Sequence, residues 1–163
     1  MLGAYHGKGK RTSVYGAFLL ACYNQSSDTY ETVCNIGTGF SDEVLASLYA
    51  DLSPIIIDRP KPFYSHSSSN QHQPDVWFEP KFVWEVKTAD LTLSPRYKAA
   101  IKEGLDDKGA EKGVSLRFPR FIKVRDDKKP DMATSSRQVA EMYRKQESVS
   151  KSKGPAVDDD FEY

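Results

Sequence analysis

The stretch SVYGAFLLACYNQSSDTYETVCNIGTGF, residues 13–40, decides the fold class of this 163-residue chain. Two segments rich in Val, Tyr, Phe, Thr and Cys flank a polar joint, QSSD. β-Branched and aromatic residues on both sides of a short polar joint are typical of a β-hairpin. We therefore predict two antiparallel strands, the first over 13–24 and the second from Thr29 until GTGF interrupts it.

A short helix is predicted directly after this hairpin. In SDEVLASLYADL, residues 41–52, Ser41 fits an N-cap and acidic residues follow it in the first turn. The apolar residues that recur on one helical face are Val44, Leu45, Leu48 and Leu52. Residues 53–80 are rich in Pro, Ser, His and Asn and indicate a loop excursion with one brief extended piece.

Two further strands are predicted, over 81–95 and within 114–127, and an amphipathic helix capped by Thr134 or Ser135 follows them. Pro119 removes a ladder donor, so the last strand must contain a bulge or form a sheet edge. The apolar residues assigned to its inner face are Leu116, Phe118, Ile122 and Val124. Those assigned to one side of the helix are Val139, Met142 and Tyr143.

The order of elements predicts a mainly β protein with an OB-fold. This is a five-stranded Greek-key barrel, here with a helix between strands 3 and 4 and a C-terminal helix, and it commonly binds nucleic acids. We assign residues 1–146 to this domain and predict a disordered acidic tail over 147–163, which ends in GPAVDDDFEY.

Composition excludes several classes of protein. The formal net charge is +0, the longest apolar run is too short to cross a bilayer, and the N-terminus does not resemble a signal peptide. A cross-strand disulfide between Cys22 and Cys34 is conceivable, but two reduced, buried thiols are the favoured reading. Three scattered histidines cannot form a zinc site or a His-based triad, so no metal site is predicted.

Basic residues concentrate in two places. In GKGKRTSVYG, residues 7–16, Lys8, Lys10 and Arg11 are placed to approach phosphates beside permissive glycines, although a solvated turn explains the same pattern. Residues 117–129 carry six basic side chains and two acidic ones. Arginines clamp phosphate oxygens with two donors at once, which lysine cannot reproduce. Phe118 and Phe121 fit either the core or a wedge in a minor groove.

RFPRFIKVRDDK, residues 117–128, resembles the last conserved motif of eukaryotic ATP-dependent DNA ligases of the replicative type (ligase I), which their C-terminal OB-fold domain carries. Four other segments resemble the same family in the same order: GAYHGKGKRTSVYGAFLLACY, CNIGTGFSDEVL, WFEPKFVWEVKTADLTLSP and QVAEMYRKQ. The resemblance extends over nearly the whole chain.

This resemblance implies a part in sealing nicks in duplex DNA during replication, repair and recombination in the nucleus. In that family ATP adenylates a lysine, AMP passes to the 5′-phosphate of the nick, and the 3′-hydroxyl displaces AMP. The last motif then implies that Arg120, Arg125 and Lys128 orient the ATP phosphates and the leaving pyrophosphate. The residues expected to contact DNA are Lys8, Lys10, Arg11, Lys87, Arg117 and Phe118.

The family's Lys-x-Asp-Gly motif, which carries the adenylated lysine, does not occur in these residues. We therefore expect a C-terminal portion that starts within the first OB strand, is inactive alone and binds no cofactor by itself. ATP and Mg²⁺ would act in the full-length enzyme. The expected partners are nicked DNA and the adenylation and DNA-binding domains of the same ligase, in a monomer without a membrane contact.

Two alternatives remain at this point. A free-standing OB module would bind single strands by stacking bases on aromatic rings, and the available rings are Tyr15, Phe18, Tyr23, Tyr30 and Trp84. A protein-interaction domain would use the terminal helix and the acidic tail, but it leaves the basic motif unexplained. Lys87 also has a second reading, as a strand residue paired with Glu85 or Glu31.

Overall fold

The computed structural model describes residues 1–67, 72–103, 105 and 112–157, without the side chains of Lys10 and of 147–157. The strands are β1 Gly3–His6, β2 Tyr15–Asn24, β3 Thr29–Ile36, β4 Ile56–Ile57, β5 Tyr64–Ser65, β6 Val76–Phe78, β7 Trp84–Lys87, β8 Asp90–Ser94, β9 Gly113–Arg117 and β10 Arg120–Val124. The helices are α1 Asp42–Leu52 and α2 Ser136–Val157. Single 3₁₀ turns are η1 Gly9–Arg11, η2 Ser53–Ile55, η3 Ile101–Glu103 and η4 Pro130–Met132.

The predicted hairpin is confirmed as β2 and β3. The two strands pair antiparallel from Phe18 opposite Ile36 to Asn24 opposite Thr29. The Asn24 side-chain oxygen accepts hydrogen bonds from the backbone N–H groups of Ser26 and Ser27, which holds the turn. The first strand begins at Tyr15, because residues 12–14 close the η1 turn instead.

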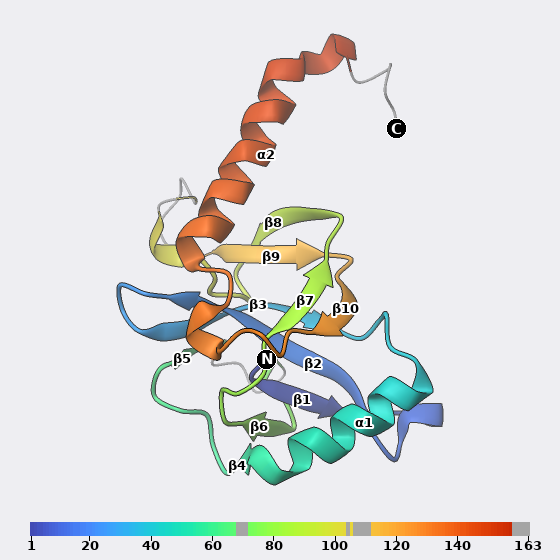
Figure 1. Cartoon of the computed structure of the whole chain (residues 1–163). Coiled ribbons are helices and arrows are strands. Elements are labelled where there is room, and N and C mark those ends of the chain that lie inside the picture. Colours follow the sequence, from blue (N-terminus) through green and yellow to red (C-terminus); the bar gives the residue numbers. More distant parts are fainter. Residues whose placement is uncertain (68–71, 104, 106–111, 158–163) are drawn as a thin grey trace.

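The hairpin forms the centre of a six-stranded sheet in the order β4-β6-β1-β2-β3-β5 (Figure 1). Two antiparallel two-stranded ladders, β7 with β10 and β8 with β9, complete the β-structure, and β9 also contacts β3. The chain is therefore mainly β with the predicted OB-fold architecture, and α1 lies between β3 and β4 in chain order.

Each of the two later predicted strands is divided in two. The first splits at Thr88 and Ala89 into β7 and β8, and the second splits at Phe118 and Pro119 into β9 and β10. Phe118 has a φ of 51°, in the left-handed region that non-glycine residues rarely adopt. The interruption expected at Pro119 is thus present, and it allows the second strand to join two different ladders.

This break corrects the predicted inner face of the last strand. Phe118 is 74% exposed and Ile122 is 45% exposed, whereas Phe121 is 6% exposed and joins the core. The left-handed residue shifts the in-out alternation, so the assignment of Phe118 and Ile122 to the interior is wrong.

The main core lies between the six-stranded sheet, α1, and the two ladders. Phe18 and Phe78 are fully buried there, and Leu45, Leu48 and Leu52 of α1 pack into the same cluster. The predicted N-cap of α1 is confirmed, because the Ser41 hydroxyl accepts a hydrogen bond from the backbone N–H of Val44 at 3.1 Å. Val44 itself is only partly buried.

The C-terminal helix projects away from the barrel (Figure 1). Its cap is Ser135, whose hydroxyl accepts from the Gln138 N–H while the Gln138 side chain accepts from the Ser135 N–H. Val139 and Met142 line the same cavity, so they lie on one side of the helix as predicted, although Met142 is 48% exposed. The helix also continues past Gln146 to Val157, where the sequence predicted a disordered tail. Residues 158–163 of that tail lie outside the described residues.

Cys22 and Cys34 are free and buried, as predicted. Burial raises the pKa of each thiol to about 12. Within the described residues, no helix is both long enough and apolar enough to cross a membrane.

Candidate nucleic-acid and phosphate interface

The basic motif lies mainly on β10, which pairs with β7. Arg120 is opposite Lys87, Phe121 is opposite Val86 and Lys123 is opposite Glu85. Arg120, Lys87 and Lys123 are exposed. The ladder therefore brings Arg120 and Lys87, which are 33 positions apart in the sequence, to one exposed surface.

Arg125 follows β10 and is held by two carboxylates. Its Nη1 donates to Glu85 at 3.2 Å, and its Nε and Nη2 donate to the two oxygens of Asp127 at 3.0 and 2.9 Å. These bonds, with Asp127 contributing most, raise the pKa of Arg125, and they lower the pKa of Asp127 to about 2. The guanidinium is thus fixed in direction, and its side chain is 30% exposed.

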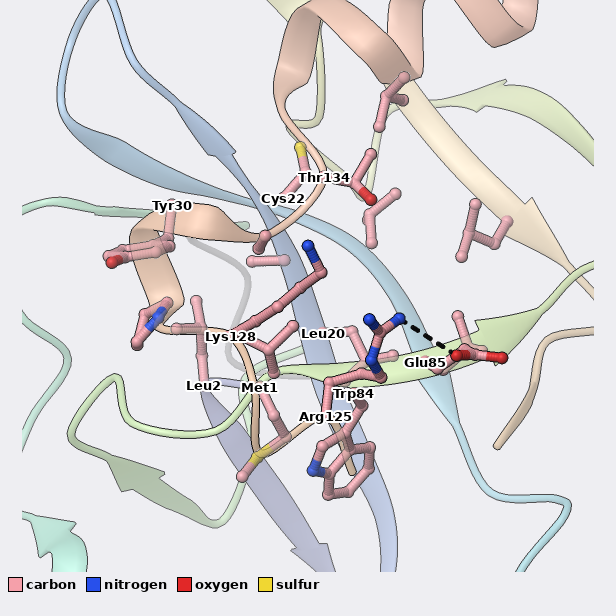
Figure 2. A pocket seen from close by; sticks show the side chains of 18 of the residues that line it. Met1, Leu2, Leu20, Cys22, Tyr30, Trp84, Glu85, Arg125, Lys128 and Thr134 are labelled. Carbon is pink, nitrogen blue, oxygen red and sulfur yellow. Dashed lines mark hydrogen bonds and ion pairs between the residues drawn. The ribbon is translucent and has the colours of Figure 1, made fainter. Parts of the chain in front are cut away.

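Arg125 and Lys128 line a cavity of about 460 Å³. The other lining side chains are partly apolar, including Leu20, Trp84 and Met132, and partly polar, including Glu85, Thr134 and Gln138. Figure 2 shows the Lys128 side chain extending toward Cys22 and Thr134, and Arg125 bonded to Glu85 on the neighbouring strand. Two of the three predicted phosphate-orienting residues therefore share one cavity, whereas Arg120 is not among its lining residues.

Arg117 and Phe118 form an exposed pair at the end of β9. The Arg117 Cζ lies 5.1 Å from the centre of the Phe118 ring, and Arg117 forms an ion pair with Asp90 at 3.4 Å. Both side chains are exposed. An apolar ring beside a guanidinium on a protruding turn has the composition of a minor-groove wedge.

The glycine-rich basic segment lies in and around η1. The Arg11 Nη1 donates to the backbone oxygens of Gly16 at 3.1 Å and Gly37 at 2.9 Å, so this side chain braces the loop. Lys8 is exposed, and the side chain of Lys10 lies outside the described residues. The sequence did not indicate this bracing role of Arg11.

The loop after β3 contacts both Arg11 of η1 and the break between β9 and β10. Next to Gly37, the Thr38 hydroxyl donates to the Pro119 oxygen at 2.8 Å, and the Phe121 N–H donates to the Thr38 oxygen at 2.9 Å. Gly39 has a φ of 94°, and a Cβ there would lie 2.5 Å from the Phe121 oxygen, so no other residue fits without a shift. Thr38 and Gly39 support the backbone at Pro119 and Phe121, and sequence reasoning missed both.

Three of the five rings proposed for stacking bases are unsuited to it, because Tyr15 and Phe18 are buried and Trp84 packs against Phe18 and Phe121. Tyr23 and Tyr30 are half-buried, with ring centres 5.2 Å apart. Lys87 cannot pair with Glu31, which is 2% exposed. Among the described residues, no group of three or more His, Cys, Asp or Glu side chains is placed to hold a metal ion.

Residues 11–128 match the family model described as ATP dependent DNA ligase C terminal region. The chain belongs to this family. It is 55% identical over 162 residues to DNA ligase 1 of Schizosaccharomyces pombe, covering 98% of the chain and 21% of that protein. It is also 55% identical over 146 residues to DNA ligase 1 of Saccharomyces cerevisiae, covering 90% of the chain and 18% of that protein.

The chain is also similar to proteins named DNA ligase from other organisms. It is 42% identical over 153 residues to the DNA ligase of Pyrobaculum calidifontis, covering 91% of the chain and 24% of that protein. Among solved structures, the ligase domain from M. tuberculosis LigD has a TM-score of 0.59 at 22% identity and covers 82% of the chain and 36% of that domain. That likeness concerns the fold. The chain thus spans about a fifth of the length of its eukaryotic relatives.

Proposed function

We propose that the chain is the C-terminal OB-fold part of an ATP-dependent DNA ligase that seals nicks in duplex DNA. Family membership and 55% identity to two eukaryotic proteins named DNA ligase 1 support this proposal. The cellular setting we propose is the nucleus, with roles in replication, repair and recombination. We assign the OB-fold domain to residues 1–146.

Within such a ligase, Arg125, Lys128 and Arg120 would orient the ATP phosphates and stabilise the leaving pyrophosphate. Fixed cations lower the barrier where charge develops, provided that they are positioned before the reaction. Two carboxylates already hold the Arg125 guanidinium, and Lys128 lines the same cavity. We propose that the adenylation domain of the same ligase would hold the Mg²⁺ that the family's ATP chemistry requires.

A second surface would contact DNA. Phe118 would enter the minor groove as an apolar wedge, with Arg117 beside it on the phosphates. Exposed Lys87 and Lys8 would contact the backbone, and Lys10 is proposed for the same role from its sequence position. Arg11 would act chiefly by bracing the loop that carries these lysines, because its Nη1 is bonded to two backbone oxygens.

These 163 residues contain no Lys-x-Asp-Gly motif. We therefore propose that the chain alone neither reacts with ATP nor seals DNA, and that it acts as a monomer with an adenylation domain and a DNA-binding domain of the same ligase.

The observation that carries the proposal is that Arg125 and Lys128 meet at one cavity in a chain that belongs to this family. The test is a chimera in which the chain replaces the matching region of S. pombe DNA ligase 1. We expect the chimera to seal nicks, and we expect Arg125→Ala to reduce lysine adenylation by on the order of 100-fold while sealing of pre-adenylated nicks falls much less.

Arg59→Ala is the matched control, because Arg59 is exposed in the loop after β4 and contributes to none of these contacts. A folded chimera that cannot seal nicks would contradict the proposal. An equal loss of adenylation and sealing in Arg125→Ala would contradict the role given to Arg125.

A further inference from the structure

Among the described residues, the hydrogen bonds of Arg125 hold its guanidinium in one orientation and leave two of its N–H donors without an acceptor. A guanidinium has five N–H donors, and the structure engages three of them, on Nε, Nη1 and Nη2. Within the part of the chain that the structure describes, one N–H on each terminal nitrogen therefore has no acceptor and is left for another partner. Two N–H groups on neighbouring nitrogens match two oxygens of a phosphate.

The two carboxylates that hold Arg125 are not equivalent. Asp127 lies two positions further along the same turn, which the Lys128 N–H closes by bonding to the Arg125 oxygen at 3.3 Å. Asp127 and Arg125 therefore move together. Glu85 belongs to β7 and is 40 positions away in the sequence, so its bond connects the guanidinium to the sheet.

Backbone hydrogen bonds and strand pairing surround this connection. The Arg125 N–H donates to the Val83 oxygen at 2.7 Å, and Val124 lies opposite Trp84 in the β7–β10 ladder. Trp84 packs against buried Phe18 and Phe121. Glu85, directly after Trp84, is thus carried by a strand that the aromatic core fixes in place.

We infer that Glu85 is a positioning residue, which holds Arg125 so that its two remaining N–H groups meet the phosphates of ATP. This inference rests on the proposed function of the chain. The side chain of Glu85 is 42% exposed and that of Arg125 is 30% exposed, so the pair adds little to the stability of the fold. The bond with Glu85 orders the long Arg125 side chain before the nucleotide binds. The entropy cost of ordering that side chain is therefore not added to the barrier of the reaction.

The test uses the chimera described above and measures single-turnover adenylation of its lysine at several ATP concentrations. Glu85→Ala should reduce the adenylation rate at saturating ATP by on the order of 10- to 100-fold, with sealing of pre-adenylated nicks unchanged. Glu85→Gln retains an oxygen that accepts from Nη1 and should recover much of the rate. In an Arg125→Ala background, Glu85→Ala should cause no further loss.

Glu79→Ala is the matched control, because Glu79 forms an ion pair of similar exposure with Lys61 outside the cavity. A thermal melt of each variant separates a loss of fold from a loss of positioning. If Glu85→Ala behaves like Glu79→Ala while Arg125→Ala is impaired, the inference is wrong and the proposed function stands. If Glu85→Ala is equally harmful with and without Arg125, the inference is also wrong. If Arg125→Ala adenylates normally, the proposed role of Arg125 fails.

Discussion

The carboxylate of Glu31 in β3 accepts a hydrogen bond of 2.5 Å from the hydroxyl of Ser136, the first residue of α2. The same carboxylate accepts from the Asn24 side chain at 3.1 Å and from the Ala100 N–H at 3.0 Å. Glu31 is 2% exposed and Ser136 is also 2% exposed. One buried acid therefore joins the hairpin, the segment before η3, and the start of the terminal helix.

Ser136→Ala is expected to destabilise the fold by about 1–3 kcal/mol, because it leaves a buried carboxylate with one donor fewer. Urea unfolding of the purified chain measures this change. Ser47→Ala, on the exposed face of α1, is the control and should change stability by less than about 0.5 kcal/mol. Equal stability of the two variants would show that the Ser136 bond does not fasten α2 to the barrel.

We expect Phe118 to lower the stability of the fold and to strengthen the contact with DNA. Its φ of 51° is costly for a side chain with a Cβ, and its 74% exposure means that little burial is lost on truncation. Phe118→Gly should therefore stabilise the chain by about 0.5–1 kcal/mol while weakening the sealing of nicked DNA by the chimera. Phe118→Leu keeps an apolar wedge and should retain more sealing activity than the glycine variant. A glycine variant that is less stable and fully active would contradict both parts of this expectation.

Local signals in the sequence were sufficient for the hairpin, for the Ser41 cap of α1, and for the start of α2 near Ser135. Each depends on residues within a few positions of one another, so the preference is readable from a short window. The OB-fold followed from their order. The split of the last strand was indicated by Pro119, but the exposure of Phe118 depends on a left-handed torsion that no pattern of apolar residues encodes.

The missed features all depend on contacts between distant residues. Glu31 was considered a partner for Lys87, whereas it is buried against Ser136, 105 positions away. Arg11 was grouped with the phosphate-binding lysines, yet it bonds to Gly37, 26 positions away. The attachment of Arg125 to Glu85 depends on the pairing of β7 with β10. The sequence does not distinguish a charged side chain that is bonded inside the fold from one that is exposed to a ligand. Only the tertiary structure shows which of the two each side chain is.

Asp127 should titrate far below an ordinary aspartate. The hydrogen bonds from Arg125 lower its pKa from 3.8 to about 2, so the folded state favours the charged form. Its contribution to stability is therefore present above pH 3.8 and is lost as the pH falls toward 2. Carboxyl carbon NMR should give a midpoint near 2, and Arg125→Ala should raise it toward 3.8.

Glu85→Ala provides the comparison for this titration, because Arg125 and Asp127 lie in one turn and remain bonded without β7. Its Asp127 midpoint should stay low. A midpoint that is the same with and without Arg125 would show that the bidentate pair does not persist in solution.

The salt dependence of DNA binding should distinguish the basic residues that touch phosphates from those that brace the fold. Each phosphate contact contributes about 0.9 to the slope of log affinity against log salt on duplex DNA. Lys87→Ala and Arg117→Ala should each reduce the slope for nicked duplex by about that amount, since both side chains are exposed at the ladder and the wedge. Arg11→Ala should leave the slope unchanged and lower the melting temperature, because the Gly16 and Gly37 oxygens lose their donor. If Arg11→Ala leaves the melting temperature unchanged and reduces the slope of log affinity against log salt, Arg11 contacts DNA and does not stabilise the loop.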